Sequence, residues 1–110
     1  MAKFMAIYTG DPDVNPGEFD QQTIAAGMAA WQAWGARYAG QIVEFGGPLG
    51  KTKRVNSNGV ADASNNIAAY VIVEADSHDA AARMFVDHPH FAIFPGDGVD
   101  VMPCMPVPGR

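Results

Sequence analysis

Residues 67–75 read Ile-Ala-Ala-Tyr-Val-Ile-Val-Glu-Ala and form the most apolar strand candidate of the chain. Both faces of this segment are largely non-polar, which is typical of a strand at the centre of a sheet. The chain then turns polar, and either Asp76 or Ser77 can cap a helix whose first turn contains Asp79. We therefore expect a central strand followed by a short helix. The core side chains of that helix are Ala81, Met84 and Phe85.

A strand is also predicted over Lys3–Thr9, where side chains alternate between two faces. One face carries Phe4, Ala6 and Tyr8, and the other carries Met5, Ile7 and Thr9. Residues 10–17, which follow, are dominated by Gly, Pro, Asn and Asp, so we expect a loop there.

A long helix is predicted over Glu18–Ala39, because apolar and small residues recur at spacings of three and four. The acidic residues Glu18 and Asp20 suit its first turn, and Gly40 suits the position after its end. The stripe that should face the sheet consists of Ile24, Met28, Trp31, Gly35 and Tyr38.

Two shorter strands are expected at Ile42–Phe45 and Val99–Met102. The segment Gly46-Gly47-Pro48 indicates a bulge or bend, after which strand pairing can resume at Thr52–Val55. Residues 56–66 are rich in Asn, Ser, Asp and Gly and are typical of a loop or a hairpin connection. The prolines after residue 102 favour an edge strand or an extended arm at the end of the chain.

The order strand, helix, strand, strand, helix, strand predicts an α+β, ferredoxin-like βαββαβ fold, with both helices on one face of an antiparallel sheet. We expect residues 1–110 to form a single domain. The other sheet face would then expose apolar side chains, which usually marks an association surface, so we expect a homodimer. The side chains expected on that uncovered face are Met5, Ile7, Val71 and Val99, or the alternate residues of the same strands.

The composition excludes several classes of protein. The 110 residues include 12 acidic and 7 basic side chains, for a formal net charge of -5. This acidic balance argues against binding to nucleic acid, which needs a cationic face. No apolar run approaches the length of a membrane span, and Cys104 is the single cysteine, so an internal disulfide is excluded. We expect a cytoplasmic protein that binds neither nucleic acid nor membrane.

The candidate catalytic residues are His88 and Asp87. Pro89 disfavours a helix, and an extended backbone would place the imidazoles of His88 and His90 on the same side. With Asp87 or Asp97, the histidines could act as a general base with an orienting carboxylate, or supply metal ligands. Alternatively, His88 bonds the last carbonyls of the second helix and His90 lies at the surface.

The candidate ligand-binding residues border a cleft between the first helix and the sheet. Trp34 lies about 60° from Trp31 around the helix, where it could form the wall of a pocket or pack in the core. The phenol of Tyr8 is a plausible polar contact in the same cleft. The full set is Tyr8, Trp34, Gly47, Pro48 and His90. No metal site is assigned, and the sequence does not identify a cofactor.

Several segments, in this order, resemble the YCII-related family, which includes the DGPF-domain proteins. The segments are Trp31-Gln32-Ala33-Trp34-Gly35 before Gly40, Gly46-Gly47-Pro48-Leu49, Tyr70-Val71-Ile72-Val73-Glu74-Ala75, Ser77, His88-Pro89-His90-Phe91 and Val99-Asp100-Val101-Met102-Pro103. The resemblance implies the same ferredoxin-like unit, paired into a dimeric α/β barrel. Some relatives are thought to use a histidine–aspartate pair, and DGPF-type members are often linked to extracytoplasmic-function sigma factors.

The chain departs from that family pattern at two places. The first helix contains no histidine, and Asn58-Gly59-Val60-Ala61 stands in place of Asp-Gly-Pro-Phe. Three functions therefore stay open. The first is a homodimer that binds a small molecule, with possible acid–base catalysis. The second is a non-catalytic regulatory or interaction module associated with a sigma factor, and the third is a metal-dependent enzyme that uses His88 and His90.

Overall fold

The computed structural model describes residues 1–11 and 19–109. Most of the loop expected over residues 10–17 therefore lies outside the described residues. The elements in chain order are β1 (Ala2–Thr9), α1 (Gln21–Arg37), β2 (Ile42–Pro48), β3 (Thr52–Asn56), β4 (Gly59–Ala63), β5 (Ile67–Ala75), α2 (His78–Arg83), α3 (Pro89–Ala92) and β6 (Gly98–Pro103).

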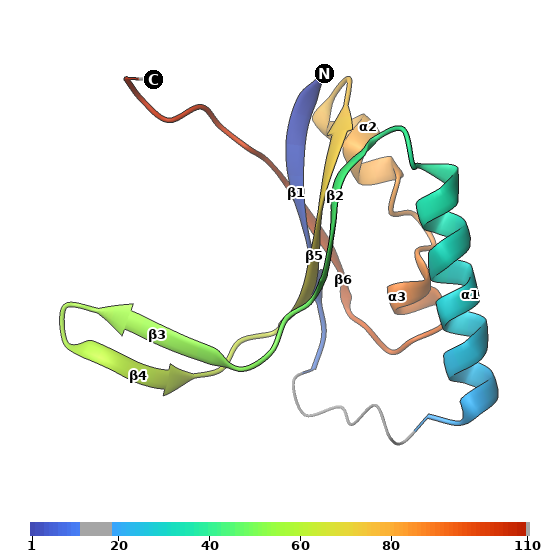
Figure 1. Ribbon diagram of the computed structural model, residues 1–110, viewed down its shortest axis with the longest axis horizontal. Coiled ribbons are helices and arrows are strands. Elements are labelled where there is room, and N and C mark those ends of the chain that lie inside the picture. Colours follow the sequence, from blue (N-terminus) through green and yellow to red (C-terminus); the bar gives the residue numbers. More distant parts are fainter. Residues whose placement is uncertain (12–18, 110) are drawn as a thin grey trace.

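The main sheet is antiparallel and has the strand order β2-β5-β1-β6, with the helices on one of its faces (Figure 1). This arrangement is the ferredoxin-like α+β fold expected from the sequence. The apolar β5 lies inside the sheet between β2 and β1, as its composition predicts. No helix within the described ranges is long and apolar enough to cross a membrane.

The core fills the layer between the sheet and the helices. On β1 the predicted alternation is confirmed, since Phe4, Ala6 and Tyr8 are buried on the helix side. Val71 pairs with Ala6 and Val99 pairs with Tyr8, so both valines also face the helices. On β5 and β6 it is therefore the alternate residues, such as Ile72 and Met102, that lie on the uncovered face. The buried apolar residues are Phe4, Ala6, Tyr8, Trp34, Val71, Val73, Ala75, Ala81, Met84 and Phe85.

Helix α1 begins at Gln21 because Asp20 caps it, its carboxylate accepting a hydrogen bond of 2.6 Å from the backbone N–H of Thr23. The predicted core stripe is confirmed in part, since Gly35 is buried and Trp31 and Tyr38 pack against the core. Ile24 and Met28 are exposed, whereas Trp34 is buried. The buried residues of α1 are Gly27, Trp34 and Gly35.

The predicted bulge in β2 is confirmed. The pairing of β2 with β5 shifts register on both sides of Glu44, and Gly46 has a φ of 61°. A side chain on Gly46 would overlap the carbonyl oxygen of Tyr70, so only glycine fits this position.

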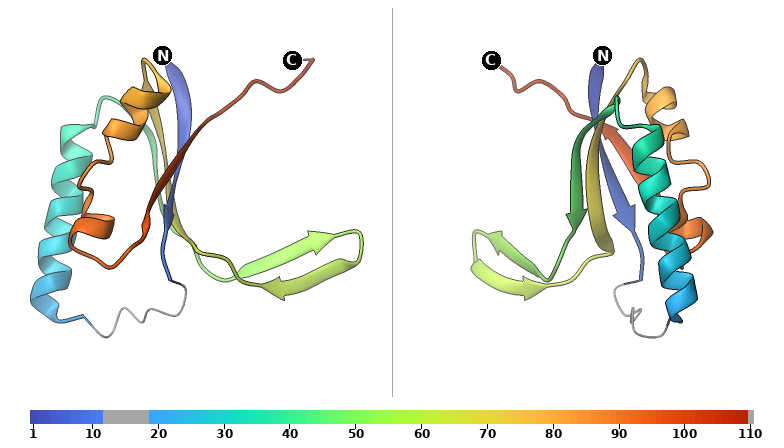
Figure 2. Two further views of the ribbon diagram at one scale, coloured as in Figure 1. Left: turned by 180° about the vertical axis from the view of Figure 1, so that it is seen from behind. Right: turned by 45° about the vertical axis from the view of Figure 1, so that its right-hand side comes forward.

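Strands β3 and β4 pair with each other and form a separate two-stranded sheet. The strand pairing predicted at Thr52–Val55 is confirmed, since β3 covers Thr52–Asn56, but its partner is β4 and not the main sheet. Of the two alternatives for residues 56–66, the hairpin is the one that forms. This hairpin, which we call the arm (residues 52–63), projects from the sheet on the side opposite the helices (Figures 1 and 2). The C-terminal residues 104–109 leave the sheet on that same side.

Candidate functional site

Pro89 starts a short helix, so the extended backbone expected around it is wrong. Proline suits the first helical position because its missing N–H has no helical partner there and its φ is already helical. His88 is the N-cap of α3, and its Nδ1 accepts a hydrogen bond of 3.0 Å from the backbone N–H of His90. His88 thus caps the start of α3. The alternative that its side chain bonds the last carbonyls of the second helix is wrong.

The Oη of Tyr8 lies 3.2 Å from the Nε2 of His88. Tyr8 is 2% exposed and His88 is 1% exposed. Burial, together with the neighbouring His90, lowers the pKa of His88 to about 4, and burial raises the pKa of Tyr8 well above its usual value. Both side chains are therefore neutral at pH 7.

The hydrogen bonds fix the tautomer of the neutral His88 ring. Because its Nδ1 accepts the His90 N–H, its proton is on Nε2, and this N–H donates to the Oη of Tyr8. The hydroxyl hydrogen of Tyr8 is then available to another acceptor. Within the described part of the chain, no second hydrogen bond of this hydroxyl is found. Tyr8 can therefore donate a hydrogen bond to an oxygen of a bound molecule.

The ring of His90 is fixed from two sides. Its Nε2 lies 2.6 Å from the carbonyl oxygen of Thr9 and must carry a proton, because a carbonyl only accepts. Gly96 lies directly against the ring, where any added side chain would overlap it. His90 therefore holds the end of β1 and keeps its own backbone N–H aimed at His88.

The carboxylates proposed to assist the histidines lie elsewhere. Asp87 is exposed with a φ of 57°, and among the described residues no hydrogen bond joins its carboxylate to His88. The structural role of Asp97 comes from its backbone N–H, which donates to the carbonyl oxygen of Thr9. Within residues 1–11 and 19–109, no three His, Cys, Asp or Glu side chains cluster closely enough to hold a metal ion.

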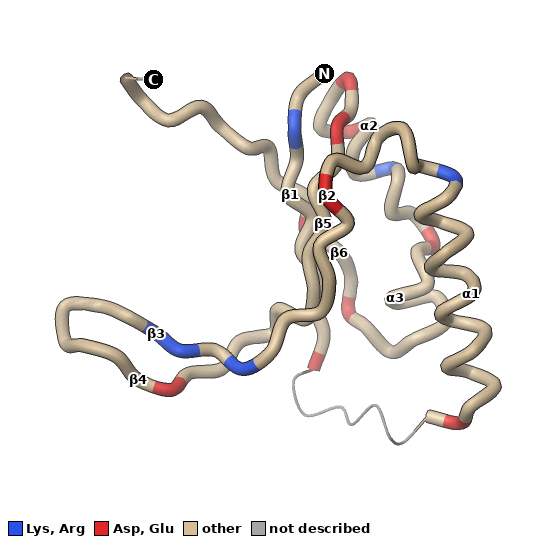
Figure 3. The backbone as a smooth tube through the Cα atoms, viewed as in Figure 1, with Lys and Arg blue, Asp and Glu red and all other residues tan. Residues whose placement is uncertain are grey.

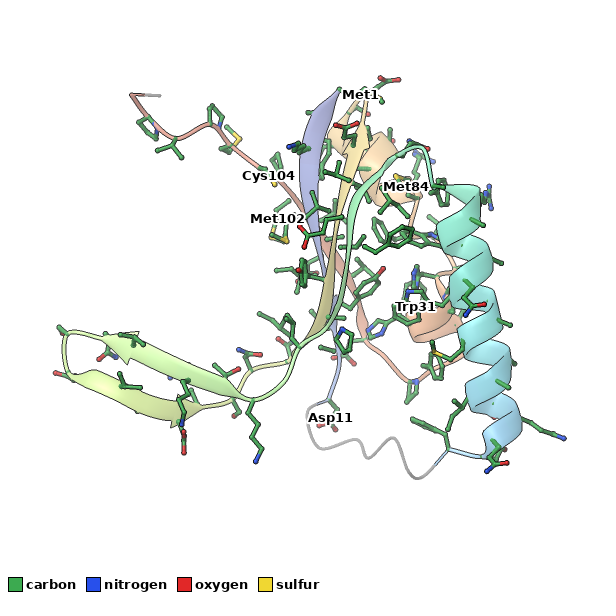
Figure 4. All side chains as sticks on the ribbon, viewed as in Figure 1. Met1, Asp11, Trp31, Met84, Met102 and Cys104 are labelled. Atoms are coloured by element: carbon green, nitrogen blue, oxygen red, sulfur yellow. The ribbon has the colours of Figure 1, made fainter. Side chains whose placement is uncertain are left out.

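Aromatic rings surround the pair of Tyr8 and His88. The centroid of the Trp31 ring lies 5.1 Å from that of Tyr8 and 4.6 Å from that of His88. Figure 4 shows Trp31 in the space between α1 and the sheet. Trp34 lies deeper, with its ring 4.8 Å from His88 and its Nε1–H donating to the carbonyl oxygen of Met84 at 2.7 Å. Trp34 therefore packs in the core, and Trp31 is the half-buried outer ring.

Gly47 and Pro48 lie on β2, away from the histidines. Pro48 pairs with Ala69 of β5, and Ala69 pairs in turn with Tyr8. One strand thus separates Pro48 from Tyr8, which places them about 10 Å apart. The structure brings Tyr8, His88 and His90 together but leaves Gly47 and Pro48 outside their contacts.

An apolar groove of about 370 Å³ runs between α1 and β2, and Trp31 forms part of its wall. The sequence interpretation missed its other lining residues. Phe45, in the bulged part of β2, covers Gly35 of α1. A sequence signal was present, because small residues recur on this side of α1. The groove is lined by Met28, Trp31, Gln32, Gly35, Ala36, Ala39 and Phe45.

The chain matches no protein-family model and no curated protein. Among solved structures it is similar to 5-chloro-2-hydroxyhydroquinone dehydrochlorinase from Burkholderia phenoliruptrix AC1100, in complex with 2,5-dihydroxybenzoquinone. The TM-score is 0.58 at 18% sequence identity, and the match covers 94% of this chain and 93% of that chain. This likeness confirms the fold class, an α+β fold with an antiparallel sheet and the helices on one of its faces.

Proposed function

We propose that this protein is a homodimer of the YCII-related type that binds a small aromatic molecule in the groove between α1 and β2. The observation that carries the proposal is the position of Trp31. Its ring forms part of the groove wall and also contacts Tyr8 and His88. An apolar ring can lie along this groove, since its walls are mainly aromatic and aliphatic.

The polar end of the ligand would be an oxygen acceptor. Its partner is the Tyr8 hydroxyl, whose hydrogen is available because its oxygen already accepts from His88. Trp31 separates this hydroxyl from the groove, so binding requires the Trp31 ring to turn aside. A hydrogen bond from Tyr8 to a carbonyl draws electrons toward the carbonyl oxygen. Tyr8 keeps its proton in this role, because burial raises the pKa of its phenol, and the N–H of His88 holds the phenol oxygen in place.

The first experiment is calorimetric titration of the full chain with 2,5-dihydroxybenzoquinone, and then with a panel of phenols, quinones and aromatic acids. The structural neighbour binds the first of these compounds. Ala36 lines the groove, whereas Ala33 lies on the exposed surface of the same helix outside it. Ala36→Leu should fill the groove and weaken binding by about tenfold or more, and the matched variant Ala33→Leu should bind like the wild type.

Two outcomes would contradict this proposal. If no compound of the panel gives saturable binding, the groove is not a binding site for aromatic molecules. If a compound binds but Ala36→Leu and Ala33→Leu behave alike, it binds elsewhere. Tyr8→Phe then tests the polar contact, because it should weaken binding of carbonyl compounds more than binding of hydrocarbons of the same shape.

A second candidate function is a non-catalytic interaction module. It is favoured by the packing beneath Trp31, where Tyr8, Trp34 and His88 fill the space between the helix and the sheet. In that case the rings serve only the core. Failure of every compound in the panel, together with a stable homodimer, would favour this second function over the first.

A further inference from the structure

A single chain of this protein is less compact than its length predicts. Its radius of gyration is 15.6 Å, against about 13 Å for a compact domain of this size. Its accessible surface is 7529 Å², whereas a monomer of this mass normally exposes about 5,900 Å². The excess of about 1,600 Å² is twice the roughly 800 Å² that each partner buries in a standard stable interface.

The arm contributes to this excess. Among the described residues its strands pair only with each other, and an isolated two-stranded hairpin is marginally stable in water. Val55 and Val60 form a cross-strand pair near its tip, yet they are 72% and 68% exposed. A hollow of about 820 Å³ separates the base of the arm from the end of the sheet. The described part of the chain therefore offers the arm no packing partner.

The sheet face turned away from the helices is also uncovered. The strand register places Met5, Ile72 and Met102 side by side on this face. Figure 4 shows Met102 and Cys104 on the side of the sheet away from the helices. The apolar residues that the register assigns to this face are Met5, Ile7, Tyr70, Ile72 and Met102. The arm and the C-terminal residues flank it (Figure 2).

The two surfaces carry opposite charge. The uncovered face has three acidic side chains and one basic one, whereas the arm and the residue before it have three basic side chains and one acidic one (Figure 3). Lys53 and Asp62 form an ion pair within the arm. The charged residues of the face are Lys3, Glu44, Glu74 and Asp100, and those of the arm are Lys51, Lys53, Arg54 and Asp62.

We propose that the arm of each subunit packs against the uncovered sheet face of a second copy of this chain. The proposal rests on the homodimer of the proposed function and names the segment that holds it together. A twofold dimer needs a self-complementary surface, and this chain carries both halves of one: a basic arm with an exposed valine pair and an acidic face with an apolar centre. Docking covers both surfaces at once.

The test compares two valines with the same exposure in one chain. Val60, on the arm, is 68% exposed, and Val86, beyond α2 on the helix side, is 67% exposed. Sedimentation equilibrium of the full chain should show a wild-type dimer. Val60→Asp should weaken the dimer by about tenfold or more, and Val86→Asp should leave it unchanged. Circular dichroism confirms that each variant is folded.

Two further measurements identify the surfaces. Lys53 lies on the same face of the arm as Val55 and Val60, so Lys53→Glu should weaken the dimer, and raising the salt concentration should weaken the wild type but have less effect on Lys53→Glu. Ile7→Lys tests the sheet face and should also dissociate the dimer. If Ile7→Lys dissociates the dimer but Val60→Asp and Lys53→Glu do not, the arm proposal is overturned and the homodimer stands. A monomeric wild type overturns both, and ligand binding in the groove is measured independently of either.

Discussion

The Nε2 of His88 lies 3.2 Å from the Oη of Tyr8, although 80 residues separate the two in the chain. This hydrogen bond joins the end of β1 to the start of α3. It also connects the core with the candidate site, because the Trp31 ring that packs on both residues forms part of the groove wall. Changes to either residue should therefore be visible in stability as well as in binding.

Tyr8→Phe should destabilise the fold by about 1–3 kcal/mol, because the buried Nε2–H of His88 loses its acceptor. Tyr38→Phe is the control. Its ring packs on Trp34 on the helix side of the sheet, and no hydrogen bond of its hydroxyl is found within the described part of the chain. Urea unfolding at pH 7 measures both changes. Equal losses of stability would show that water reaches the Nε2 of His88 in the variant.

Stability should fall as the pH is lowered from about 6.5 to 4. In this interval the unfolded chain protonates His88 near its ordinary pKa of about 6.5, whereas the folded state keeps it neutral until its pKa of about 4. Protons therefore favour the unfolded state, and the contribution is fully present above pH 6.5. The loss from this group amounts to about 3 kcal/mol at most.

His88→Asn isolates this effect, because an asparagine oxygen can still cap α3. The difference in unfolding free energy between the wild type and His88→Asn should shrink as the pH falls through this interval. A difference that stays constant from pH 7 to pH 4 would show that His88 does not titrate in this way.

Gly96→Ala should destabilise the protein by about 1–3 kcal/mol, since the added methyl group overlaps the His90 ring and pushes it from the carbonyl of Thr9. Gly98→Ala is the matched control, because a side chain at Gly98 meets no atom within 4 Å. Thermal unfolding of the two variants measures the difference. Similar melting temperatures would mean that the His90 ring has room to move.

Local sequence patterns predicted most of the fold. The alternation in Lys3–Thr9 and the apolar run at 67–75 identified the strands of the sheet centre, and Ser77 is the cap of α2, its hydroxyl accepting from the N–H of Ala80 at 3.0 Å. Helix α3 was missed because Pro89 was interpreted as a helix breaker. The same residue is favourable at the first position of a helix, and only the following turn distinguishes the two cases.

The contact face of α1 was predicted less well, for a physical reason. Glycines, alanines and two tryptophans are distributed around the whole circumference of this helix. Several of its faces are therefore about equally apolar, and a tertiary hydrogen bond decides which one meets the core. The Nε1–H of Trp34 donates to the carbonyl oxygen of Met84, which lies 50 residues away in the chain. This hydrogen bond holds the Trp34 ring in the core. For the site, the sequence analysis predicted Tyr8, His88 and His90. The hydrogen-bond partners of their side chains could not be predicted, because residues about 80 positions apart in the chain provide them.

The two tryptophans of α1 should separate stability from binding. Trp34→Phe leaves the buried carbonyl of Met84 without its donor and removes volume from the core, so it should cost about 2–4 kcal/mol in unfolding free energy. Trp31→Phe should cost less, because Trp31 is half-buried and its ring makes no hydrogen bond to the described part of the chain. Calorimetry should give the opposite order, with Trp31→Phe weakening the binding of an aromatic ligand by about tenfold and Trp34→Phe changing it little. If Trp34→Phe instead abolished binding in a folded protein, the ligand would lie in the core beside His88, and the groove between α1 and β2 would not be the site.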